Sequence, residues 1–123
     1  MTMPDAPVRT RFERSTPILS VADVARSVRY YVDVLGFRNA EWGNDDFTCI
    51  TRDNADIYLS KGDQGQAGTC VWVGVEDVEA LYAEIVPKGA IILHPPENFS
   101  WAHEMKVGDP DGHVLRFGSD PKE

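Results

Sequence analysis

The chain has 123 residues, of which 42% are hydrophobic and 26% are charged. This length fits one domain with a single core, and the proportions are those of an ordinary globular protein, not of a disordered or fibrous one. Twenty acidic side chains against twelve basic ones give a net charge of -8. That charge repels phosphates, so it excludes nucleic acid and favours a cationic partner. No apolar stretch approaches the ~20 residues that cross a bilayer, and the first residues do not resemble a secretory signal. We therefore expect a cytoplasmic protein without a membrane segment.

The chain begins with an arm and continues into a half with a βαβββ pattern. Residues 1–14 carry prolines and arginines without an apolar period, which predicts an extended arm before a single domain at 15–120. The pattern at 16–21 predicts a strand. Asp23 then stands where an N-cap precedes an apolar helical stripe, which Gly36 ends. Three more strands are predicted, at 38–43, 46–51 and 55–60.

A second half repeats this order of elements. The pattern at 71–75 predicts a strand, Asp77 is the next N-cap, and Pro87 and Gly89 end the second helical stripe. Further strands are predicted at 90–94, 102–108 and 113–118, separated by a loop at 94–98 and a turn at 109–112. We therefore divide the domain into a first module at about 15–60, a connector at 61–68 and a second module at about 69–118. The repeated order, with Val-x-Asp-Val before each helix, indicates an internal duplication.

Three segments resemble signatures of the vicinal oxygen chelate superfamily, which includes glyoxalases, ring-cleaving dioxygenases and bleomycin-binding proteins. They are SVADV at 20–24, YYVDVLGF at 30–37 and GDPDGH at 108–113. The resemblance implies an α+β fold in which two βαβββ modules form a curved mixed-sheet cup. Five further segments are similar to the bleomycin-binding resistance proteins: DDF at 45–47, RDN at 52–54, VWV at 71–73, LYAE at 81–84 and SWAHE at 100–104. Those proteins sequester the drug without destroying it, and their chains pair, often exchanging the N-terminal arm.

The enzymes of this superfamily hold a divalent metal on four cup-facing His or Glu side chains. The corresponding positions here are Thr16, Tyr58, Cys70 and Arg116. None is a His or Glu ligand, and the Arg116 guanidinium would repel a dication. His103 and Glu104 are neighbours on one strand, so they point to opposite faces and cannot easily share a metal. We therefore expect neither a metal nor another cofactor.

Alternation with period two divides the strand residues between the cup and the helices. The side predicted to face the helices is almost purely apolar and comprises Leu19, Val21, Ile57, Leu59, Val71, Val73, Leu115 and Phe117. The side predicted to face the cup is chemically mixed and comprises Thr16, Ile18, Ser20, Asp56, Tyr58, Ser60, Cys70, Trp72, Gly74, Val114 and Arg116.

The resemblance adds acidic and aromatic residues around this cup. The predicted ligand-binding set is Glu41, Trp42, Asp45, Asp46, Phe47, Tyr58, Cys70, Trp72, Trp101 and Arg116. Flat ligand rings would stack on the aromatic residues, and a cationic group would meet the carboxylates. Phe47 and Trp72 could instead be core residues, and the three acidic residues could form an ordinary solvated face.

The sequence favours a metal-free protein, with no catalytic residue, that binds a cationic aromatic antibiotic at a homodimer pocket. Two departures from the bleomycin binders bear on the ligand: Cys70 stands where they have tryptophan, and the segment between Phe37 and Asp46 is one residue longer. A lyase, dioxygenase or thiol transferase with an atypical or absent metal site is the alternative. Cys70 as its nucleophile lacks a histidine placed to activate it. A sensor or carrier of another small molecule is a third possibility.

Overall fold

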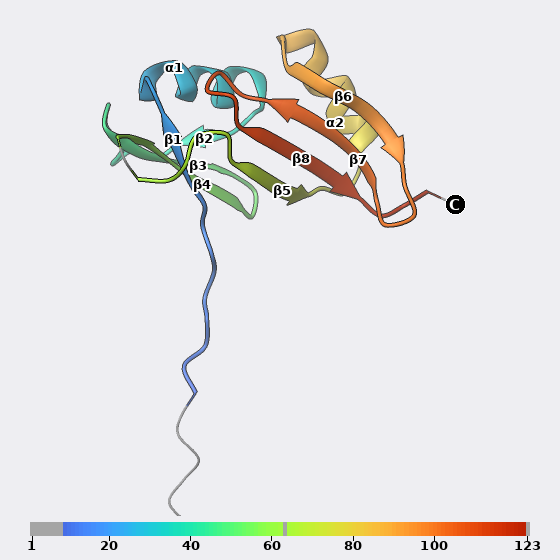
Figure 1. Cartoon of the computed structure of the whole chain (residues 1–123), viewed down its shortest axis with the longest axis horizontal. Helices are drawn as coiled ribbons and strands as arrows, with labels where there is room; N and C mark the ends of the chain where they lie inside the picture. Colours follow the sequence, from blue (N-terminus) through green and yellow to red (C-terminus); the bar gives the residue numbers. More distant parts are fainter. Residues whose placement is uncertain (1–8, 63, 123) are drawn as a thin grey trace, which may run out of the picture.

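The structure is a computed structural model that describes residues 9–62 and 64–122. Two four-stranded mixed sheets lie side by side, one from each half of the chain (Figure 1). The strands of the first sheet are β1 (Ile18–Val21), β2 (Arg38–Asn39), β3 (Phe47–Arg52) and β4 (Ala55–Lys61). Their order is β1-β4-β3-β2, with β1 parallel to β4 and the other pairs antiparallel.

The second sheet has the same topology. Its strands are β5 (Cys70–Gly74), β6 (Ile91–Asn98), β7 (His103–Gly108) and β8 (Val114–Ser119). Their order is β5-β8-β7-β6, with β5 parallel to β8 and the other pairs antiparallel. The predicted α+β fold class with two βαβββ modules is therefore confirmed.

Each module has one helix between its first and second strands. Helix α1 (Val24–Arg29) begins at Asp23, whose carboxylate accepts a hydrogen bond from the Arg26 amide, and it continues as the π-helix η1 (Tyr30–Val34). Helix α2 (Val78–Ile85) begins at Asp77 in the same way and continues as the 3-10 turn η2 (Val86–Lys88). The sequence pattern predicted both caps, but not the wider π-helical turn.

The core lies between the helices and one face of each sheet. All eight residues that the alternation assigned to the helix side are buried in this core or packed against it. We call the opposite face of each sheet the cup face. Burial of the apolar side leaves the cup face free to carry other chemistry.

Buried and half-buried hydrogen bonds join the two modules at one seam. The Tyr31 hydroxyl donates to the Asp109 carboxylate over 2.8 Å, and the Tyr30 hydroxyl donates to the Gly108 carbonyl over 2.6 Å. His113, which is fully buried, accepts from the Thr69 amide through Nδ1 and contacts the Ser20 carbonyl through Nε2 at 2.6 Å. The seam therefore fixes the second module against the first.

Two predicted boundaries were wrong. Residues 94–98, expected as a loop, are the continuation of β6. Because β6 is an edge strand, Pro95 and Pro96 are tolerated there, and its register with β7 shifts on either side of His94. Strand β2, expected to reach residue 43, ends at Asn39, because the chain then turns through a hydrogen bond from the Gly43 amide to the Ala40 carbonyl.

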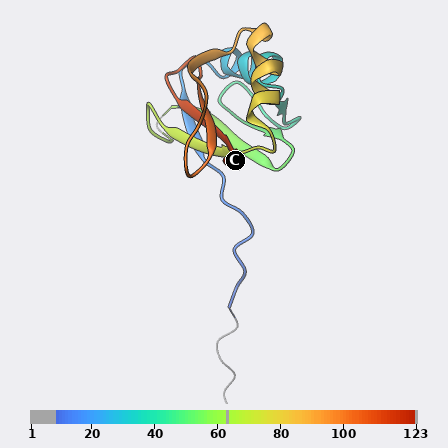
Figure 2. The ribbon, with the colours of Figure 1, turned by 90° about the vertical axis from the view of Figure 1, so that its right-hand side faces the viewer.

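The described part of the arm, from residue 9 onward, leaves the body as an extended segment (Figures 1 and 2). Phe12 is 92% exposed, and the Arg14 guanidinium bonds Asp56 at 2.8 Å. The first eight residues of the predicted arm lie outside the described residues. In the described ranges, no helix has the length and apolar character that crossing a membrane requires.

Candidate ligand-binding site

An aromatic cluster covers part of the cup face of the first sheet. Phe47 on β3 and Tyr58 on β4 have ring centroids 5.1 Å apart. Trp42, from the turn before β3, stacks on Phe47 at 6.2 Å with an interplanar angle of 24°. Trp42 is 60% exposed, so its indole is supported by Phe47 and still open to solvent. We call Trp42, Phe47 and Tyr58 the first aromatic wall.

The three predicted acidic residues lie beside this wall. Glu41, Asp45 and Asp46 are all exposed in the segment between β2 and β3. Asn44 fixes the end of this segment, because its side-chain oxygen accepts hydrogen bonds from the amides of Asp46 and Phe47 over 2.8 and 3.0 Å. The exposed segment that carries these residues therefore forms the rim of the first wall, next to Trp42 and Phe47 in the chain.

Trp72 provides an open indole on the cup face of the second sheet. It stands on β5 and is 53% exposed, because its ring lies across the backbone of Gly74 and Gly118. A Cβ atom at Gly118 would lie 2.6 Å from Cζ2 of the indole. The glycine on β8 therefore allows the ring to lie flat on the sheet.

Trp101 is the most exposed of the three tryptophans. It lies in the turn between β6 and β7 and stacks on Phe99, with centroids 4.7 Å apart and an interplanar angle of 9°. Its indole is 63% exposed, and its Nε1 donates a hydrogen bond to Glu104. We call Trp72, Phe99 and Trp101 the second aromatic wall.

A half-buried ion pair lies beneath the second wall. Glu104 on β7 is only 4% exposed, and its carboxylate accepts from Arg116 Nε at 3.1 Å and from Nη2 at 2.8 Å. Burial alone raises the pKa of Glu104. The hydrogen bonds from Trp101 and Arg116, with the Arg116 charge, outweigh burial and hold that pKa below its usual value. The carboxylate is therefore ionised and the pair is electrically neutral overall.

The remaining predicted position, Cys70, is exposed at the start of β5 opposite Val114. The positions corresponding to the superfamily's metal ligands carry a hydroxyl, a phenol, a thiol and a guanidinium, which do not fit a divalent metal centre of the His/Glu type. Within residues 9–62 and 64–122, His, Cys, Asp and Glu form no group of three or more that could hold a metal.

The predicted residues therefore form two separate groups, and the aromatic contacts given for these residues stay within each group. Trp42, Phe47 and Tyr58 meet on the first sheet, whereas Trp101 and Arg116 meet through Glu104 on the second. Sequence reasoning missed Glu104 and Phe99 as site residues. The signals for Glu104 were the SWAHE segment at 100–104 and alternation, which placed it on the face opposite His103.

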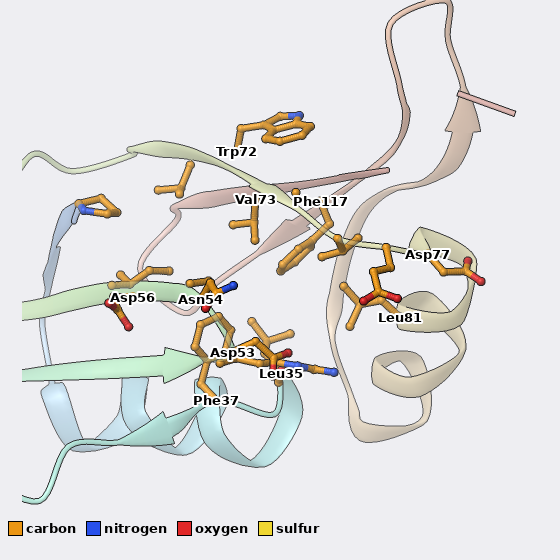
Figure 3. Close-up of a pocket in the computed structure, with 18 of the residues that line it drawn as sticks. Leu35, Phe37, Asp53, Asn54, Asp56, Trp72, Val73, Asp77, Leu81 and Phe117 are labelled. Atoms are coloured by element: carbon orange, nitrogen blue, oxygen red, sulfur yellow. Dashed lines mark hydrogen bonds between the residues drawn. The ribbon is translucent and has the colours of Figure 1, made fainter. Parts of the chain in front are cut away.

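A hollow lies elsewhere, between the β3–β4 turn, β5 and α2 (Figure 3). It has a volume of about 870 Å³, and its apolar lining includes Phe37, Val73 and Phe117. Of the predicted site residues, Trp72 alone is among those that line it, and Figure 3 shows its ring on the other side of β5 from Val73. Carboxylates surround the hollow: Asp53, Asp56, Glu76, Asp77 and Glu84. We call this hollow the acidic groove.

Comparison with known proteins agrees with this architecture. The bleomycin resistance proteins of Geobacillus stearothermophilus and Staphylococcus aureus are each 29% identical, over 85% of this chain and 94% of the relative. A solved bleomycin-binding protein from Streptomyces verticillus, in complex with copper(II)-bleomycin, has a TM-score of 0.72 and 24% identity over 94% of this chain and 100% of that one. TnmS3, an antibiotic binding protein from Streptomyces sp. CB03234, has a TM-score of 0.74 and 20% identity over 93% and 100% of the two chains. A family model described as "Glyoxalase superfamily protein" matches residues 5–122. The chain therefore belongs to the glyoxalase superfamily.

Proposed function

We propose that this protein is a metal-free binding protein that sequesters a cationic, aromatic antibiotic of the bleomycin type in the cytoplasm, without chemical change to the drug. The observation that carries the proposal is the pair of open indoles, each backed by a phenyl ring. Trp42 stacks on Phe47, and Trp101 stacks on Phe99. An exposed ring held by a second ring is a preorganised stacking surface for a flat ligand.

The charges around the walls support a cationic ligand. Glu41, Asp45 and Asp46 carry three negative charges at the rim of the first wall. In the second wall the cation of Arg116 is compensated by Glu104. The chain as a whole has a net charge of -8. Such a surface attracts a cation over a distance and does not repel it at the stacking rings.

The pocket is proposed to form between the two chains of a homodimer, with the first wall of one chain facing the second wall of the other. Support comes from the separation of the walls within one chain, since each alone is an open surface. The arm supports the pairing too: Phe12 is 92% exposed beside Arg9, Arg11 and Arg14, and the acidic groove offers the complementary charge and an apolar floor. Light scattering should give about twice the chain mass of 13.7 kDa, and deletion of residues 1–14 should shift it toward one chain.

The absence of a resident metal is part of the proposal. It rests on the four residues at the superfamily's metal positions, of which Arg116 is already engaged by Glu104. Elemental analysis of protein purified without a histidine tag should find well under one equivalent of zinc, nickel, iron or manganese. A near-equimolar metal that only a chelator removes would contradict it.

Titration of bleomycin against intrinsic tryptophan fluorescence tests the function itself. Saturable quenching is expected because the ligand rings would stack on Trp42 and Trp101. After prolonged incubation, the drug released by denaturing the protein should have an unchanged mass. Lack of saturable binding would refute the proposal, and a mass change would favour the enzymatic alternative.

A further inference from the structure

We propose that Glu104 is the positioning residue of the second wall: it cancels the charge of Arg116 beneath the stacking rings and fixes the orientation of Trp101. This inference rests on the proposed function, because it specifies how that pocket accepts a cation. The sequence placed Glu104 beside His103, on the opposite face of the same strand, and gave it no role in the site.

Both oxygens of the Glu104 carboxylate are occupied. Oε1 accepts from the Trp101 indole and from Arg116 Nη2 at 3.0 Å, and Oε2 accepts from Arg116 Nε and Nη2 at 3.1 and 2.8 Å. One carboxylate therefore links a turn residue to the floor of the cup. Because the indole N–H has a fixed direction in the ring plane, this bond sets the tilt of Trp101.

The location of the pair gives it a role in binding. The Arg116 side chain is 36% exposed on the cup face, next to Trp72 on the neighbouring strand, so its charge is felt at the second wall. A bare guanidinium there would repel a cationic ligand, by roughly fivefold in local concentration at a distance of 4 Å in water. With Glu104 in place, the pair is neutral, and exposed Lys106, opposite Arg116 on β7, is the neighbouring cation that stays unchanged in all the variants below.

The structure contains a second ion pair of the same kind that does not lie on the cup face. Arg52 and Glu84 form a similar two-point ion pair, at 2.8 and 2.9 Å, but they join β3 to α2 on the helix side. Arg52 also donates to the Leu35 carbonyl, so this pair ties helix ends together. It has the same chemistry as Glu104 and Arg116, but in the described chain none of its hydrogen bonds reaches an indole, and Glu84→Gln is therefore the control for the loss of one carboxylate.

Charged quenchers of tryptophan fluorescence test the charge at the second wall without any ligand. In a Trp42→Phe background the remaining tryptophans are Trp72 and Trp101. We expect Glu104→Gln to raise quenching by iodide and lower quenching by caesium, changing their ratio by about two- to fivefold at low ionic strength. The double variant Glu104→Gln/Arg116→Gln should return the ratio to that of the parent, and Glu84→Gln should leave it unchanged.

Arg116→Gln provides the reverse case if Glu104→Gln does not fold, because it leaves the carboxylate uncompensated and should favour caesium. Circular dichroism identifies which variants are folded. An unchanged quenching ratio in a folded Glu104→Gln or Arg116→Gln variant would overturn the charge role.

Bleomycin binding then tests the consequence for the ligand. Glu104→Gln keeps an oxygen for the Trp101 indole, so its expected loss of affinity, about fivefold at low salt, reports charge alone. The double variant should recover most of that loss. Glu104→Met should recover none of it, because methionine has no oxygen to accept the hydrogen bond from the Trp101 indole. Equal weakening by Glu104→Gln and the double variant would refute the inference. Lack of binding by the unmodified protein would refute the proposed function instead, and the quenching ratios would still decide the role of Glu104.

Discussion

The two modules share one topology but present chemically different walls on their cup faces. The first wall rests on other aromatic rings and has carboxylates only at its exposed rim. The second wall rests on a half-buried ion pair and on two glycines that make room for an indole. In both modules the core is built entirely on the helix side. A repeated βαβββ unit can therefore keep its stability on one face while the other face diverges in chemistry.

Removal of one indole from each wall tests whether both walls bind the ligand. Trp101→Ala and Trp42→Ala should each weaken bleomycin binding by about 2 kcal/mol or more, because each deletes a supported stacking surface. Trp42 is 60% exposed, so Trp42→Ala should change the free energy of unfolding by less than about 0.5 kcal/mol. Trp101→Ala also removes a hydrogen bond from buried Glu104 and should lower that free energy by about 1 kcal/mol. Isothermal titration and urea unfolding measure the two quantities.

Leu93→Ala is the control for these variants, since Leu93 is also 53% exposed on the second sheet but belongs to neither wall. It should leave affinity unchanged. If only one of the tryptophan variants lost affinity, a single wall would bind the ligand and the facing arrangement of two walls would be wrong.

The second prediction contrasts the walls with the seam between the modules. Tyr31→Phe should lower the free energy of unfolding by about 1.5 kcal/mol, because buried Asp109 loses a hydrogen bond from the phenol. Tyr58→Phe, on the first wall, should change it by less than about 0.5 kcal/mol. Neither variant adds or removes a charge at neutral pH.

The pH dependence of the Tyr31 effect has a definite sign. Burial and then the Asp109 charge raise the pKa of Tyr31 above its ordinary value. A group whose pKa is raised on folding contributes stability that is fully present below its unfolded pKa, about 10 for tyrosine. That contribution is lost as the pH rises beyond it. The difference between the parent and Tyr31→Phe should therefore shrink above about pH 10, and a difference that grows there would contradict the assignment.

Local sequence patterns predicted the features that depend on neighbouring residues. Asp23 and Asp77 begin helices because a carboxylate before an apolar stripe caps free amides, and that requires only a few residues of context. Alternation likewise separated the core face from the cup face. The loop predicted at Pro95 and Pro96 was wrong, because a strand at the sheet edge does not need the missing amides.

The candidate site required information that is not local. Glu104 and Arg116 are 12 residues apart in the sequence, and only the register of β7 with β8 brings them together. The stacking of Trp101 on Phe99 depends on the conformation of one turn. Residue types therefore predicted which side chains were candidates for the site. Which of these side chains contact one another depends on the tertiary structure.

The third prediction concerns the acidic rim, which is present on the first wall alone. Replacing Glu41, Asp45 and Asp46 with their amides should weaken bleomycin binding by less than about 1 kcal/mol each at low salt. The loss should fall further at 0.5 M salt because exposed charges are screened. Stopped-flow measurements should place it mainly in the association rate. A loss that persists at high salt would mean that these carboxylates contact the ligand directly.

The smallest expected effect lies at the Arg52–Glu84 pair, which joins the two modules on the helix side. The hydrogen bonds that Glu84 accepts from Arg52 outweigh the effect of burial and hold the pKa of Glu84 below its usual value. A carboxyl whose pKa is lowered on folding contributes stability above its unfolded pKa, about 4.3 for glutamate, and loses it as the pH falls. Both side chains are about one third exposed, so solvent screening limits the contribution to less than about 1 kcal/mol.

Urea unfolding at pH 7 should therefore show a small deficit in Glu84→Gln that disappears at pH 3. Glu104 also has a lowered pKa, but it is present in both proteins and cancels in the difference. A deficit of equal size at both pH values would show that Glu84 acts through packing and not through its charge.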